Sequence, residues 1–131
     1  MPVLPWIAGT HQPSEQDSLH VFTSRLPLRR YRDVPRFLVW TWRIGDQLRK
    51  TDGCVGFTLD AHLFSKTFAT LSAWSDPDTM NHFVRSGAHA AMLADMAGRM
   101  GRPTFVGSAA TAGDIPLDWT AARARLAEHE E

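Results

Sequence analysis

The stretch Thr70-Leu71-Ser72-Ala73-Trp74-Ser75-Asp76-Pro77 decides the fold of this chain. Residues that suit a strand run up to the tryptophan, and Asp76-Pro77 follows, where Asp favours a helix N-cap and Pro the first helical turn. The stretch therefore predicts a strand over 66–74 that leads directly into a helix. Within that helix Ser86-Gly87 interrupts the apolar phase, and His89 follows on the apolar stripe. An ionisable ring at such a position needs a physical reason.

The segments on either side complete the order of secondary structure. Residues 54–63 alternate, with Val55, Phe57, Leu59, Ala61 and Leu63 on one face of a strand and Cys54, Gly56, Thr58, Asp60 and His62 on the other. Apolar spacings of three and four predict a helix over 34–50 with Asp33 as its N-cap. We also expect an irregular arm over 1–17, strands over 18–26 and 103–110, and a tail helix over 118–130.

Length and composition indicate a single globular domain. A chain of 131 residues can bury one core, which we place in residues 18–131. Its 14 basic and 14 acidic residues cancel, so neither nucleic acid nor a membrane surface is expected as a partner. The single cysteine, Cys54, excludes an internal disulfide and suits a reducing compartment. Residues 1–6 lack a leader pattern and no apolar run spans a bilayer, so we expect a cytoplasmic protein.

The order β, α, β, β, α, β followed by a helix is the split βαβ, ferredoxin-like plan, an α+β fold with an antiparallel sheet. This plan places both main helices on one face of the sheet and leaves the other face bare. A bare apolar face usually marks a partner or ligand site. Two copies packed sheet to sheet would cover it, so we expect a homodimeric α/β barrel with a cavity for an apolar small molecule.

The residues from Thr70 to Asp76, with Phe83 and Ser86-Gly87-Ala88-His89, resemble the dimeric α/β barrel superfamily. Within it the chain is most similar to a group that resembles spheroidene monooxygenase and the antibiotic biosynthesis monooxygenases, over residues 18–111 in element order. This resemblance implies a homodimer that binds a hydrophobic or aromatic small molecule. The superfamily includes cofactor-free and haem-dependent monooxygenases and polyketide cyclases, so the implied cofactor is none or haem. His89 is the residue that matches the family's histidine.

His89 has a structural and a functional interpretation. As a structural residue, its neutral imidazole would donate one hydrogen bond to a backbone carbonyl. As a functional residue, it would take a proton from a phenolic substrate, giving an anion that reacts with O2, or bind haem iron through Nε2. The expected ligand-binding side chains around it are Trp74, Phe83, Met92, Met96, Trp40 and His62.

Other polar residues give weaker signals for chemistry. His20, His62 and His89 lack the local spacing of a metal site, so no metal ion is expected. Asp60 is interpreted as an acid that faces water at a strand end; inside a cavity it could instead orient His62. Cys54 has no cationic neighbour in the sequence, so we do not expect it to act as a nucleophile.

The arginine run Arg29, Arg30 and Arg32 allows two interpretations. It can form a solvated loop, or it can clamp a carboxylate, such as a haem propionate, at the mouth of a cavity. The solvated loop is the simpler of the two interpretations.

Three functions remain open from the sequence. The leading hypothesis is a monooxygenase-like oxidoreductase that acts on a hydrophobic or aromatic small molecule, with His89 as base or ligand. The alternative is a non-catalytic or cyclase-like dimer that binds a small apolar ligand between walls formed by Trp40, Trp42 and Trp74. The third is a structural dimer whose own side chains fill the cavity.

Overall fold

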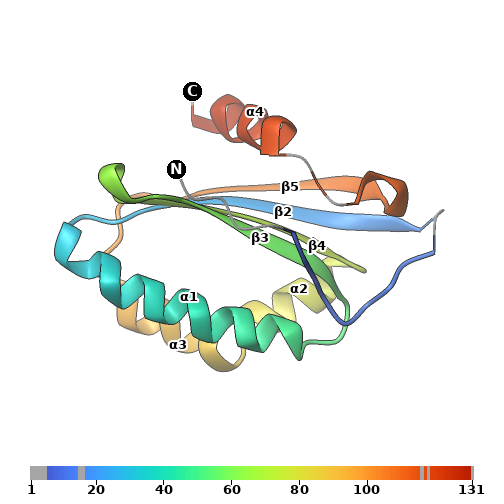
Figure 1. Ribbon diagram of the computed structural model, residues 1–131, viewed down its shortest axis with the longest axis horizontal. Coiled ribbons are helices and arrows are strands. Elements are labelled where there is room, and N and C mark those ends of the chain that lie inside the picture. The colour runs from blue at the N-terminus through green and yellow to red at the C-terminus, as the bar shows by residue number, and fades with distance from the viewer. Residues whose placement is uncertain (1–5, 15–16, 116, 118, 131) are drawn as a thin grey trace.

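The computed structural model describes residues 6–14, 17–115, 117 and 119–130, with side chains through residue 128. A five-stranded antiparallel sheet carries α1, α2 and α3 on one face and α4 on the other (Figure 1). Residues 1–5 and 15–16 of the expected arm, and Asp118 at the expected start of the tail helix, lie outside the described residues.

The described elements follow the order that the sequence predicts. The strands are β1 (Ile7–Ala8), β2 (Ser18–Pro27), β3 (Cys54–His62), β4 (Thr67–Trp74) and β5 (Thr104–Thr111), arranged as β1-β3-β4-β2-β5. The helices are α1 (Val34–Arg49), α2 (Pro77–Val84), α3 (Gly87–Met96) and α4 (Trp119–Glu130). This is the ferredoxin-like βαββαβ fold with a C-terminal helix. The sequence does not predict β1, which pairs with β3 at the edge of the sheet.

The junction between β4 and α2 forms as predicted. Asp76 caps α2, because its Oδ1 accepts hydrogen bonds from the Thr79 backbone N–H at 2.8 Å and from the Thr79 hydroxyl at 2.9 Å. These bonds lower the pKa of the Asp76 carboxyl. The predicted phase change is a complete break, with α2 ending at Val84 and α3 beginning at Gly87. Gly87 has a φ of +52°, a left-handed conformation that glycine adopts at little cost.

Asp33 occupies the N-cap position of α1, but its side chain does not cap the helix. Its Oδ1 instead accepts a hydrogen bond from Arg99 Nη1 at 3.1 Å. Pro35, in the first turn, has no N–H to donate to a cap. The prediction is therefore correct in position and wrong in hydrogen-bond partner.

A β-bulge changes the faces at the start of β3. The predicted alternation holds from Phe57 to His62. Leu63, which was expected on the same face as Phe57, instead begins a short 3-10 turn after the strand. The register with β4 shifts between Cys54 and Gly56, so Cys54 packs in the same apolar cluster as Phe57. Val55 turns to the opposite face of the sheet. The prediction for these first residues is wrong because a bulge inserts one residue into the alternation.

The sheet face that was expected to be bare is covered by α4, and we call it the α4 face (Figure 1). Trp119, Ala122 and Leu126 follow a spacing of three and four, which puts them on one stripe of the helix. Ala122 and Leu126 are buried and contact apolar side chains of β2, β4 and β5. The expectation of a bare face is wrong because the chain supplies its own cover.

The opposite face, which we call the α1–α3 face, carries two apolar clusters. One gathers around Phe37, Phe68 and the methionines of α3. The other gathers around Trp74 and Phe83 at the junction of β4 and α2. None of the helices among the described residues combines the length and the apolar character needed to cross a membrane.

Candidate functional site

His89 lies in the first turn of α3, directly after the break that follows α2. Its ring centroid is 5.2 Å from that of Phe83, which is 5.1 Å from that of Trp74. Trp74 and Phe83 are buried, whereas His89 is half-buried. The structure thus brings together three of the residues that the sequence proposes for the site, with the imidazole at the more open end of an aromatic row.

Gln47 of α1 holds the backbone around His89 in place. Its Oε1 accepts a hydrogen bond from the His89 backbone N–H at 2.9 Å, and its Nε2 donates to the Ser86 carbonyl at 2.9 Å. The amide therefore satisfies the His89 N–H, one of the N–H groups that a helix leaves unpaired at its start. It also adds a bond to the Ser86 carbonyl, which already accepts from the Ala90 N–H at 3.2 Å. The sequence analysis missed Gln47, and the signal that could have found it is a polar residue beside the apolar stripe of α1.

The hydrogen bond at Nδ1 determines which nitrogen of His89 carries the proton. Nδ1 lies 3.2 Å from the Val84 carbonyl, and a carbonyl can only accept, so Nδ1 is the protonated nitrogen. Burial lowers the pKa of His89, and the bond to Val84 acts weakly in the opposite direction. The ring is therefore neutral at pH 7, and Nε2 carries a lone pair. Within the described part of the chain, Nε2 has no hydrogen-bond partner.

Acid should destabilise the protein partly through His89. Because the folded-state pKa lies below the ordinary value of 6.5, the stability from the neutral ring is complete above that pH and is lost as pH falls through the folded pKa. We expect the free energy of unfolding in urea to fall more for the wild type than for His89→Gln between about pH 7.5 and about pH 5. The exposed His82→Gln should follow the wild type, and equal losses in all three proteins would contradict the expectation.

Three other proposed site residues belong to the apolar cluster around Phe37 and Phe68. Met92 and Met96 of α3 are buried in the cluster that contains Phe37 and Phe68. Trp40 of α1 packs against the same cluster, and its Nε1 donates to Asp95 Oδ2 at 2.7 Å. The structure thus groups these three residues with one another and places them in a different cluster from Trp74 and Phe83.

His62 lies on the α4 face, on the other side of the sheet from His89, and is paired with Asp60. Oδ2 of Asp60 accepts from His62 Nε2 at 2.8 Å and from Arg123 Nη2 of α4 at 2.8 Å. Asp60 is 1% exposed, so the interpretation of a water-facing acid is wrong; α4 covers it. Burial acts to raise the pKa of Asp60, but the bonds and charges of Arg123 and His62 outweigh it and the pKa is lowered.

Metal binding and thiol chemistry gain no geometric support. Among the residues that the structure describes, no group of three or more His, Cys, Asp or Glu side chains could hold a metal ion. Burial raises the pKa of the Cys54 thiol to about 11, so the thiol stays protonated at pH 7. A protonated thiol is a poor nucleophile.

A haem held by both His89 and the arginine run does not fit this geometry. Arg29 and Arg30 line a cavity beside Asp33 at the start of α1. His89 is bonded to Gln47, near the other end of the same helix. The two positions are roughly 20 Å apart along the helix axis at 1.5 Å per residue, so the arginines are poorly placed to hold the propionates of a His89-bound haem.

Solved structures share the fold of this chain. No protein-family model matches the sequence, and no curated protein matches it. A candidate monooxygenase of Lactobacillus acidophilus superposes with a TM-score of 0.63 at 9% identity, covering 82% of this chain and 50% of that one. A candidate antibiotic biosynthesis monooxygenase of Caulobacter crescentus superposes with a TM-score of 0.60 at 16% identity, covering 72% and 90%.

A third structure, of an antibiotic biosynthesis monooxygenase, has a TM-score of 0.60 at 12% identity and covers 69% of this chain and 95% of its own. This chain spans about half the length of the Lactobacillus protein and most of the other two. At such low identities the similarity establishes the fold. The chain therefore has the ferredoxin-like fold of the antibiotic biosynthesis monooxygenases, as its resemblance to them implies.

Proposed function

We propose that the protein is a monooxygenase-like oxidoreductase that acts on a hydrophobic or aromatic small molecule, with His89 as its general base. The observation that carries the proposal is the neutral imidazole at the end of the Trp74–Phe83 row, with its Nε2 lone pair unused. A half-buried base at the open end of this row can reach the hydroxyl group of an aromatic substrate. The shared fold of the monooxygenases supports the reaction class by analogy.

The proposed reaction needs only the substrate and O2. Nε2 of His89 takes the proton of a phenolic hydroxyl, and the electron-rich ring carbon of the resulting anion forms a bond to O2. The imidazolium returns its proton to the distal oxygen, giving a hydroperoxide. The O–O bond of the hydroperoxide then breaks as the hydrogen on the same ring carbon leaves as a proton, and water departs from a quinone. One oxygen atom enters the product, the other leaves as water, and the substrate supplies all four electrons that reduce O2.

Oxygen consumption with a panel of mono- and polycyclic phenols tests this reaction. We expect His89→Ala to lower the rate by about a hundredfold or more, which is the usual contribution of a positioned base. The exposed His82→Ala serves as a matched control and should keep the wild-type rate. The proposal fails if the folded wild type consumes no oxygen with any phenol, or if His89→Ala retains full activity.

A haemin titration separates base catalysis from haem chemistry. For a base that acts without cofactor, we expect no saturable Soret band in the wild type. A saturable band that is shifted or weakened in His89→Ala would contradict the cofactor-free proposal and assign His89 to iron.

A second candidate function is that of a non-catalytic or cyclase-like binding protein. It is favoured by the close packing of the site, since Trp74 and Phe83 are only 1% and 5% exposed. The His89 bond to the Val84 carbonyl is also the bond that a structural histidine would make. Quenching of tryptophan fluorescence by a phenol without oxygen uptake would favour this candidate.

We also propose that the protein works as a homodimer in a reducing, cytoplasmic setting. Phe105 is 52% exposed on β5, which ends the described sheet, and an unpaired strand edge with an apolar side chain favours association. The free, buried thiol of Cys54 suits a reducing compartment. Light scattering of the purified protein should give twice the monomer mass.

A further inference from the structure

A cavity of about 290 Å³ opens at the N-terminal end of α1, far from His89. Its lining residues are Arg29, Arg30, Asp33, Asp95, Gly98 and Arg99. We propose that this cavity binds a small molecule through a phosphate or carboxylate group, which Arg29 and Arg30 hold. The proposal does not depend on the oxidoreductase function.

Backbone bonds between the end of β2 and the segment after α3 build the cavity. The Arg29 N–H donates to the Arg99 carbonyl at 2.9 Å, and the Gly101 N–H donates to the Pro27 carbonyl at 2.8 Å. These bonds bring together two segments that lie about seventy residues apart in sequence. Because of these backbone bonds, Arg29 and Arg30 line the same cavity as Arg99 and do not belong to a free loop.

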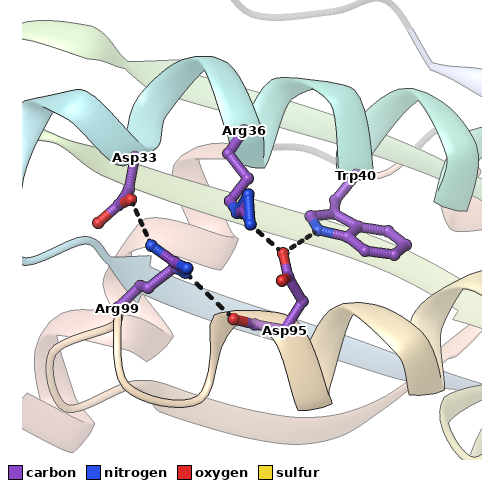
Figure 2. A network of polar contacts seen from close by, with 5 residues as sticks. All are labelled: Asp33, Arg36, Trp40, Asp95 and Arg99. Carbon is purple, nitrogen blue, oxygen red and sulfur yellow. Dashed lines mark hydrogen bonds and ion pairs between the residues drawn. The ribbon is translucent and has the colours of Figure 1, made fainter.

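Both acidic side chains of the cavity already have cationic partners (Figure 2). Asp33 Oδ1 is 3.1 Å from Arg99 Nη1, and Asp95 Oδ2 is 3.1 Å from Arg36 Nε. Trp40 Nε1 donates to the same Asp95 oxygen, and Arg99 Nε donates to the Asp95 backbone carbonyl at 3.2 Å. This network ties the start of α1 to the end of α3 and forms one fixed wall.

Arg29 and Arg30 are the cavity's uncompensated charges. Both side chains are exposed, and neither makes an ion pair or a side-chain hydrogen bond within the part of the chain that the structure describes. Four arginines face two carboxylates when Arg36 is included, so the region carries two net positive charges. The charge balance selects an anion as the ligand and disfavours a metal ion.

Oxyanions are the ligands that suit this arrangement. A guanidinium group offers paired N–H donors that match the oxygens of a phosphate or a carboxylate. The N-terminal end of the long helix α1 adds favourable positive potential at the same place. The volume suits a small anionic group rather than a large cofactor, since ligand cavities for drug-sized molecules begin at about 300 Å³.

Titration calorimetry at low ionic strength with pyrophosphate and with succinate tests the proposal and distinguishes the two kinds of oxyanion. We expect the wild type to bind at least one of them, and the double variant Arg29→Gln, Arg30→Gln to weaken its binding by about tenfold or more. Arg32→Gln is the matched control, because Arg32 belongs to the same run and does not line the cavity. It should retain wild-type affinity.

Three results would overturn the proposal. The first is that neither anion binds the wild type. The second is that Arg32→Gln weakens binding as much as the double variant does. The third is that sodium chloride at matched ionic strength produces the same heat. The second and third would show a diffuse charge effect in place of a site. Circular dichroism of each variant confirms folding, which should persist because both substituted side chains are exposed.

Discussion

Replacement of Trp74 by alanine is expected to lower the free energy of unfolding by about 3–5 kcal/mol. The side chain is 1% exposed and packs against Phe83 where β4 meets α2. Its Nε1 donates to the Ser72 hydroxyl at 2.9 Å. The substitution would remove a large apolar surface from the core and leave a cavity at the junction that orients α2.

Urea unfolding followed by circular dichroism measures this effect. Trp42→Ala is the matched control, because Trp42 is 77% exposed on α1, and its loss should change the free energy of unfolding by no more than about 0.5 kcal/mol. If Trp74→Ala cost less than about 1 kcal/mol, the neighbouring side chains would have to collapse into the space. That result would contradict the close packing of the aromatic row.

The sequence predicted the elements whose signals are local. The Asp76 cap, the Ser86-Gly87 break and the alternation from Phe57 to His62 each depend on residues within one or two turns. Their physical causes, namely cap hydrogen bonds, glycine's freedom and strand pleating, do not require knowledge of the tertiary fold. The boundaries of β2, β4, α1 and α4 therefore agree with the prediction closely.

The features that the sequence did not reveal depend on distant partners. The Gln47 side chain of α1 accepts a hydrogen bond from the backbone of His89 in α3, and Arg123 of α4 donates one to Asp60 of β3. A lone glutamine or aspartate carries no mark of such a partner. The bulge before Phe57 likewise arises from pairing with β4, and so it reversed the faces of the residues before it.

Leu126→Asp is expected to release α4 from the sheet. Leu126 is 4% exposed and packs against Ala69 and Val106 on the α4 face. Burial of an unpaired carboxylate would cost more free energy than the helix gains by docking, so α4 should leave the sheet. The free energy of unfolding should then fall by about 2 kcal/mol or more. The matched control is Ala127→Asp, which adds the same charge at the next, exposed position of the helix.

Dye binding and light scattering report the release of α4. The freed sheet should bind a hydrophobic dye and associate, whereas Ala127→Asp should behave as the wild type. Wild-type behaviour of Leu126→Asp in both measurements would show that α4 does not dock in solution.

The hydroxyls of Thr23 and Ser108 on the α4 face are buried without a hydrogen-bond partner among the described residues. These two hydroxyls oppose the docking of α4. A defined assembly of Leu126→Asp that is larger than that of the wild type would therefore indicate that sheet-to-sheet association, as the sequence suggests, competes with the chain's own helix for one surface.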